Sequence, residues 1–147
     1  MLSSKLLVSS VAVLALLGFS SAVLGSAAPQ SPSKLGTSME EIGAAVKSIQ
    51  ATLKTPAEIS TALPEVWKAQ RAVLDAKSEL PKLVTDLTDE KAKAKAGLEY
   101  RTQMQDLMRA FLDVESAVLA GDAKKAEKAL RAADNLKSGG HGKFRPQ

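Results

Sequence analysis

Apolar residues recur every three or four positions in four stretches of the chain, which is the spacing of one face of an α-helix. No stretch shows the two-residue alternation of a half-buried strand. In the first stretch, Ser38 and Glu41 form a capping box, in which each side chain bonds the other residue's backbone N–H, and this predicts a helix that begins at Ser38. Its apolar face comprises Met39, Ile42, Val46, Ile49 and Leu53.

The second stretch contains two prolines. Thr55 and Glu58 form another capping box around Pro56, and proline is well suited to the first position of a helix. Pro64 lies inside the helical pattern, and because proline lacks a backbone N–H, we expect either a kink or a split into two helices. The apolar face comprises Ile59, Leu63, Val66, Val73 and Leu80.

The last two stretches are separated by a tight turn. After a connection at about residues 81–88, the third helix is predicted from about Asp89 to Ala120. Gly121 should end it in the left-handed conformation, and Asp122 should cap the helix that follows. The inward residues of the third helix are Tyr100, Met104, Leu107, Met108, Phe111, Val114 and Val118, and those of the fourth are Ala126, Ala129, Leu130, Ala133 and Leu136.

The short connections set the topology. The links at residues 54–55 and 121–122 are so short that the helices they join must be antiparallel neighbours. We therefore predict an all-α fold, an antiparallel up-down-up-down four-helix bundle, over residues 38–147.

The first 28 residues have the layout of a secretory signal peptide. Lys5 is followed by an uncharged apolar run and then by small residues up to Ala28. A retained N-terminal anchor is the alternative, although the run is short for a membrane span. Residues 29–37 are rich in Pro, Ser and Gly and predict a flexible lead-in. The expected location of the protein is the periplasm.

The composition excludes several classes of site. The chain has no cysteine, which excludes disulfides, thiolate catalysis, thiolate metal sites and covalent haem attachment. With a single histidine as well, the usual catalytic constellations are unavailable, and we predict that the protein is not an enzyme. The formal net charge is +4 with the two signs interspersed, which favours neither nucleic-acid binding nor stable membrane association. Nothing in the sequence indicates an obligate oligomer, and a monomer is expected.

Met39 and His141 come from opposite ends of the domain but should meet at one end of the bundle. The first helix begins where the fourth ends, and His141 is displaced by about 20° from the core residue Leu130 if the last helix persists. A thioether and an imidazole together are a ligand set for haem iron. Tyr100 and Met104 would lie beside the gap between them. A core methionine and a solvated tail histidine are the alternatives.

The C-terminal run His141-Gly142-Lys143-Phe144-Arg145 resembles the closing H-x-K-aromatic-R of the soluble cytochrome b562 family. Met39-Glu40 and the apolar ladder after it resemble the start of that family's first helix. Leu119-Ala120-Gly121 is similar to its turn before the last helix, and Leu74-Asp75-Ala76 also matches. The resemblance covers about residues 39–145.

This resemblance implies a periplasmic electron-transfer protein that binds one non-covalent b-type haem, iron protoporphyrin IX, with Met39 and His141 as axial ligands. Its electron donors and acceptors would be unidentified redox proteins. The other positions that match haem-contacting residues of the family are Tyr100, Met104, Lys137 and Arg145.

Two features depart from the family pattern. Gly139 and Gly140 precede the histidine where the family is helical, so we expect this segment to fray without haem. Met104 stands where an aromatic residue is usual, which implies looser packing on the porphyrin.

Two other functions remain open: a haem-free exported helical bundle acting as an adaptor or stress-binding protein, and a five-coordinate haem sensor or enzyme bound through His141 alone.

Overall fold

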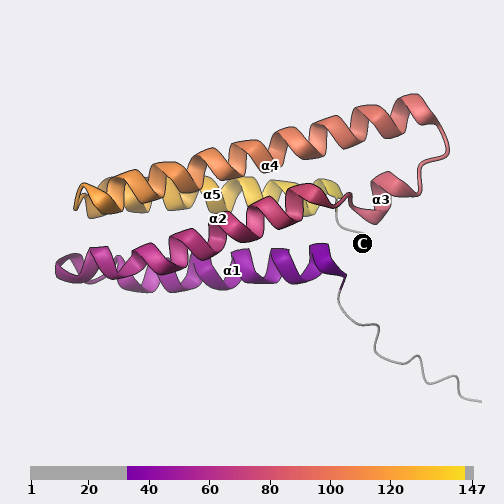
Figure 1. Ribbon diagram of the computed structural model, residues 1–147. Coiled ribbons are helices and arrows are strands. Elements are labelled where there is room, and N and C mark those ends of the chain that lie inside the picture. Colours follow the sequence, from indigo (N-terminus) through magenta and orange to yellow (C-terminus); the bar gives the residue numbers. More distant parts are fainter. Residues whose placement is uncertain (1–32, 145–147) are drawn as a thin grey trace, which may run out of the picture. The chain divides into compact units, whose positions relative to one another are not determined.

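The structure, a computed structural model, describes residues 33–144, and these residues are helical throughout apart from short connections. The expected signal peptide at residues 1–28 lies outside the described residues, as do residues 29–32 of the expected lead-in and Arg145. The elements shown in Figure 1 are α1 (Lys34–Thr52), the 3-10 helix η1 (Pro56–Ala62), α2 (Leu63–Ser78), the short α3 (Lys82–Thr85), α4 (Glu90–Leu119) and α5 (Ala123–Phe144).

The first helix begins one turn earlier than predicted. Ser33 is the N-cap, and its Oγ accepts a hydrogen bond from the backbone N–H of Gly36 at 3.0 Å. The predicted capping box at Ser38 is therefore wrong: this side chain is buried, and its hydroxyl donates to the carbonyl of Lys34 at 3.1 Å. The extra turn brings Leu35 against the hydrophobic core, so burial extends the helix into the expected flexible lead-in.

Pro64 splits the second predicted helix in two, rather than only kinking it. The chain forms the 3-10 helix η1 first, and α2 then begins at Leu63 with Pro64 in its first turn, where the missing N–H is harmless. The predicted capping box at Thr55 is wrong, because its side chain makes no capping hydrogen bond. The following connection contains the single turn α3, which places Val84 in a buried position.

The predicted junction between the last two long helices is confirmed. Asp89 caps α4 through a hydrogen bond that its Oδ1 accepts from the N–H of Lys91 at 3.0 Å. Gly121 has a φ of 70°, which is the left-handed conformation that glycine adopts without strain. Asp122 then caps α5, its Oδ1 accepting from the N–H of Lys125 at 3.0 Å.

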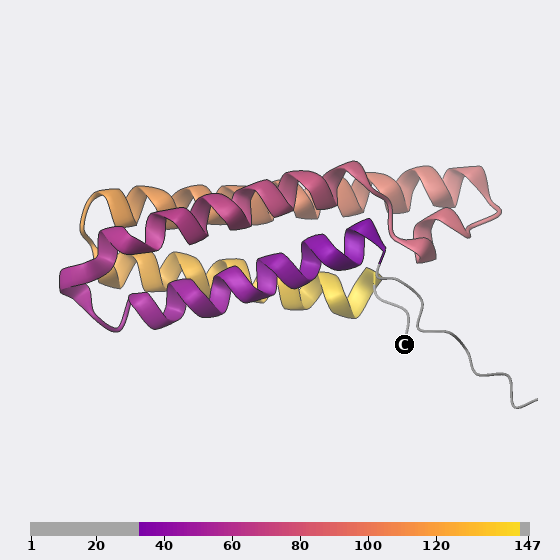
Figure 2. The ribbon, with the colours of Figure 1, turned by 60° about the horizontal axis from the view of Figure 1, so that its bottom comes forward.

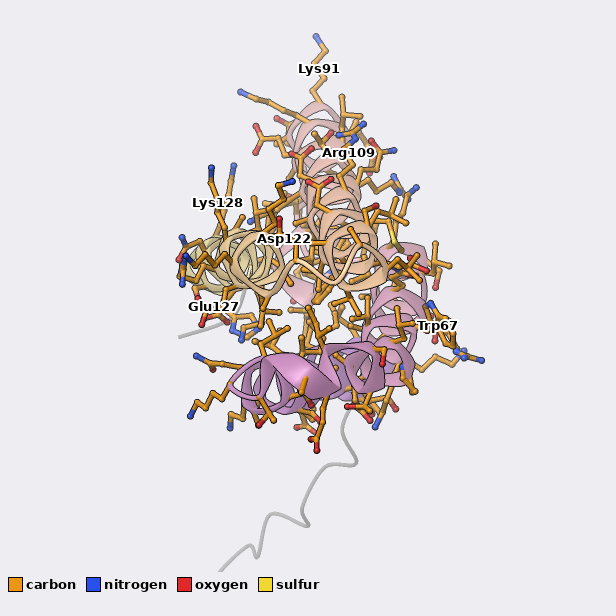
Figure 3. The ribbon with its side chains drawn as sticks, turned by 90° about the vertical axis from the view of Figure 1, so that its left-hand side faces the viewer. Trp67, Lys91, Arg109, Asp122, Glu127 and Lys128 are labelled. Carbon is orange, nitrogen blue, oxygen red and sulfur yellow. The ribbon has the colours of Figure 1, made fainter. Side chains whose placement is uncertain are left out.

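The four long helices form the predicted antiparallel bundle, with α1 packed against α2, α4 against α5, and the two pairs joined mainly through α2 and α4. Figure 3 looks along the bundle: Trp67 marks α2 on one side and Lys128 marks α5 on the other, with α1 and α4 between them. The start of α1 and the end of α5 lie at the same end of the bundle in both side views (Figures 1 and 2).

The four sides of the bundle are not equally tight. Buried side chains from all four long helices form one hydrophobic core, in which Phe111, Ile42, Ile49 and Leu107 are the largest fully buried residues. Yet α1 and α5, which run side by side in Figure 2, make far fewer contacts with each other than any other adjacent pair of long helices. We call this side the α1/α5 seam.

Candidate cofactor site between α1 and α5

Met39 lies on the flank of α1 that faces the seam. The opposite flank faces α2, because Lys34, Thr37 and Glu41 line a 350 Å³ cleft together with residues of α2. At about 100° per residue, Met39 is about 160° around the helix axis from Glu41. Its side chain is half-buried and packs against the edge of the hydrophobic core. The thioether is therefore placed on the α5 side of α1, close to the start of the helix.

His141 lies on the flank of α5 that faces the seam from the other side. The flank turned to α4 is marked by Lys143, whose Nζ is 2.7 Å from a carboxylate oxygen of Glu99, and by Gly140, which lies against Gln103. His141 is about 160° around the helix axis from Lys143. It is half-buried, in the last turn of α5. The imidazole is thus carried on the side of α5 nearest to α1.

These two placements bring a thioether and an imidazole to facing flanks of two helices, at the end of the bundle where α1 starts and α5 ends (Figure 2). The donor set suits haem iron, which methionine and histidine ligate as a pair in electron-transfer cytochromes. The flanking core is apolar, as a porphyrin face requires. The residues present therefore fit a non-covalent haem at the seam.

Tyr100 closes the same end of the bundle from α4. Its side chain is buried, and its hydroxyl donates to the carbonyl of Ala76, in α2, at 2.7 Å. Burial, with a smaller contribution from the negative charge of Glu79, raises the pKa of Tyr100 to about 12. The ring also meets Phe144 edge to face, with centroids 5.3 Å apart. Tyr100 therefore ties α4 both to the end of α2 and to the end of α5.

Met104 and Lys137 have different relations to the seam. Met104 is buried, but it lines a 200 Å³ groove between α2 and α4 with Leu74 and Met108, on the side of α4 turned to α2. Met104 also belongs to the hydrophobic core that all four long helices share, and Met39 packs against that core. Lys137 lies one turn before His141, its side chain is only 18% exposed, and its Nζ is 2.6 Å from a carboxylate oxygen of Asp134.

Two polar residues of α4 that the sequence analysis did not single out contact the helix that carries His141. Gln103 donates from Nε2 to the carbonyl of Leu136 at 3.1 Å. Glu99 pairs with Lys143, whose hydrogen bond and positive charge lower the pKa of the Glu99 carboxyl. The available signal was their four-residue spacing next to the inward face of α4, which places both on the flank facing α5.

Other kinds of site find no support in the part of the chain that the structure describes. Between residues 33 and 144, no three side chains of histidine, aspartate or glutamate are grouped so as to hold a metal ion. Within the same residues, no helix has the length and apolar character needed to cross a membrane.

The comparison with known families points to the same chemistry as the seam. The family model described as Cytochrome b562 matches residues 34–145, which include both candidate ligands and all four long helices. No curated protein and no solved structure matches the chain significantly. Proteins of the matched family are electron carriers rather than enzymes. The chain belongs to the cytochrome b562 family.

Proposed function

We propose that this protein is a periplasmic electron carrier that binds one haem b non-covalently, with Met39 and His141 as its axial ligands. The observation that carries the proposal is the placement of these two donors on facing flanks of the α1/α5 seam, in a chain of the cytochrome b562 family. The bound haem would supply one-electron chemistry at its iron.

The chemistry of the two donors favours electron transfer over substrate turnover. When Met39 and His141 both ligate, no position is left for dioxygen or another substrate. A thioether is a soft donor that favours the reduced iron and therefore raises the reduction potential. His141 ligates only as the neutral imidazole, so acidification should weaken binding of the haem. The apolar core beside the seam acts in the same direction as Met39, because burial disfavours the extra charge of the oxidised iron.

Other residues at the end of the bundle where α1 starts and α5 ends would contact the haem or its propionates. Tyr100 and Phe144 pack edge to face at the end of the bundle. Lys137 supplies a positive charge one turn before His141. We assign Lys137, with Arg145, to the anionic propionates of the haem. Met104, a buried residue of the shared core, would pack against the porphyrin.

The test is an absorption spectrum of the purified full chain, before and after titration with hemin. The wild type should give a six-coordinate low-spin spectrum in both oxidation states. Met39→Ala and His141→Ala should each lose that spectrum, whereas the matched control Met108→Ala, a half-buried methionine on the α2/α4 groove, should keep it.

The outcomes separate the proposal from its alternatives. A wild type that stays colourless after hemin is added would refute the proposal and favour a haem-free bundle acting as an adaptor. A five-coordinate high-spin spectrum in the wild type that is unchanged in Met39→Ala, together with loss of haem in His141→Ala, would refute the ligand pair and favour a site bound through His141 alone. Location is tested separately, by N-terminal sequencing of protein recovered from the periplasm, which should show that the first residues, up to about Ala28, have been removed.

A further inference from the structure

The end of α5 that carries His141 is poor in helix-forming residues. Gly139, Gly140 and Gly142 surround the histidine, and glycine is among the least favourable residues in a helix interior. In the structure α5 nevertheless continues through the glycines to Phe144. Contacts from outside α5 can offset the low helix propensity of this end, and α4 supplies several of them.

The first contact comes from Gln103 and lies before the histidine. Its Nε2 donates a part-buried hydrogen bond to the carbonyl of Leu136, one turn before Gly140. Gly140 is itself buried, and a Cβ there would lie 3.0 Å from Nε2 and 3.4 Å from Cδ of Gln103. Glycine at this position leaves the space that the amide of Gln103 occupies. Gly142 has no such neighbour, because a Cβ there would meet nothing within 4 Å.

Two further contacts lie after the histidine and come from the same turn of α4. Glu99 pairs with Lys143 at 2.7 Å, and Tyr100 packs edge to face on Phe144 at 5.3 Å between ring centroids. In the chain, His141 therefore lies between two sets of contacts from α4, and helix rotation places its position on the opposite flank of α5.

We propose that Gln103 is a positioning residue for His141. Its amide donates a hydrogen bond to the carbonyl of Leu136 and occupies the space that a side chain at position 140 would need. These two contacts attach the turn of α5 that carries His141 to α4, on the flank opposite the histidine. The role rests on the proposed function, because it concerns a haem ligand. Gln103 contacts α5 at Leu136 and Gly140. It acts by keeping the backbone before His141 helical, so that the imidazole is already directed at the seam when haem enters.

The first experiment compares Gln103→Ala with Gln105→Ala, an exposed glutamine two positions away that lines the α2/α4 groove instead. Haem release from the loaded protein is followed by transfer to excess apomyoglobin. Gln103→Ala should release haem about fivefold to tenfold faster, which corresponds to one net hydrogen bond. It should also gain high-spin character at saturating hemin. Gln105→Ala should stay within about twofold of the wild type.

A second measurement does not depend on haem at all. Hydrogen exchange of the haem-free chain should show faster exchange at amides 140–144 in Gln103→Ala, with residues of α1 unchanged. A general loss of stability would instead raise exchange throughout the bundle.

A double-mutant cycle tests the contact itself. In the wild-type background, Gly140→Ala should speed haem release and reduce protection of the end of α5, because its Cβ would lie 3.0 Å from Nε2 of Gln103 and push the amide away from the carbonyl of Leu136. In the Gln103→Ala background, the same change should slow haem release, since the space is then free and alanine favours the helix. The sign of the effect should reverse.

The failures are distinguishable. If the wild type binds no haem, the proposed function is refuted. If the wild type binds haem but Gln103→Ala matches Gln105→Ala, or Gly140→Ala has the same effect in both backgrounds, the positioning role alone is refuted.

Discussion

The hydroxyl of Tyr100 stabilises the bundle at neutral pH but should destabilise it in alkali, and Tyr100→Phe tests both effects. The hydroxyl is buried and donates to the carbonyl of Ala76 at 2.7 Å. That carbonyl also accepts from the N–H of Glu79 at 3.2 Å, so the variant leaves no buried acceptor without a partner. At pH 7, Tyr100→Phe should therefore lower the free energy of unfolding by about 1 kcal/mol, the net contribution of one hydrogen bond. The larger penalty of a buried acceptor without a partner does not arise.

The raised pKa of Tyr100 reverses this difference at high pH. Burial, and then the charge of Glu79, raise the pKa to about 12 in the folded protein, against about 10 in the unfolded chain. Above pH 10 the unfolded chain releases the phenol proton first, so the wild type loses stability as the pH rises from about 10 to 12, up to about 2–3 kcal/mol. Phenylalanine has no such proton. The stability curves of the two proteins should therefore cross at about pH 10.7.

Urea unfolding of the haem-free proteins, followed by circular dichroism at 222 nm, measures the difference. The variant should be less stable by about 1 kcal/mol at pH 7 and more stable by about 1 kcal/mol at pH 11.5. Every other pH effect that the two proteins share cancels in the comparison. A difference that stays constant between pH 9 and pH 12 would refute the argument, because the hydroxyl would then titrate normally in the folded state.

Three other predictions follow from single sites. Gly121→Ala should destabilise the protein by about 1 kcal/mol in urea unfolding, because the φ of 70° is unfavourable for alanine although its Cβ would meet nothing within 4 Å. Phe111→Ala should lower the free energy of unfolding by about 3–5 kcal/mol in the same assay, since the ring is fully buried in the core. A decrease below about 1 kcal/mol would mean that the core collapses around the site. Hydrogen bonds from Gln70 and then Trp67 lower the pKa of Glu115, so the stability that they add is present above the ordinary carboxyl range and is lost as the pH falls through the lowered value. Trp67 emission should therefore change in acid in the wild type and lack that step in Glu115→Gln.

The sequence was sufficient where neighbouring residues decide the structure. Gly121 and Asp122 end one helix and start the next through their own backbone and side-chain chemistry. The choice between Ser33 and Ser38 as the first cap could not be made locally, because both can accept the capping hydrogen bond. Burial of Leu35 against the core favours the earlier start, and Ser38 then becomes a buried helix residue.

Rotation along a helix predicts the flank on which a residue lies but not its surroundings. The pairing of Met39 with His141 across the seam stays a prediction, which the axial-ligand variants test. Met104 belongs to an apolar stripe wide enough to contact α2 as well as the bundle interior, and which neighbour it meets depends on how the helices are arranged. Gln103 carries no hydrophobic signal, and its importance depends on the missing side chain of Gly140 in another helix.

The distribution of contacts around the bundle explains why the seam suits a cofactor. Each ligand-bearing helix is held mainly by the neighbour on its other side, α1 by α2 and α5 by α4, and the two make few contacts with each other. A group that entered between α1 and α5 would leave the contacts of α1 with α2 and of α5 with α4 in place. The same arrangement means that α1 and α5 gain little from each other without that group. A ligand bound through both Met39 and His141, in the folded state alone, would join these two helices and stabilise the fold by its binding.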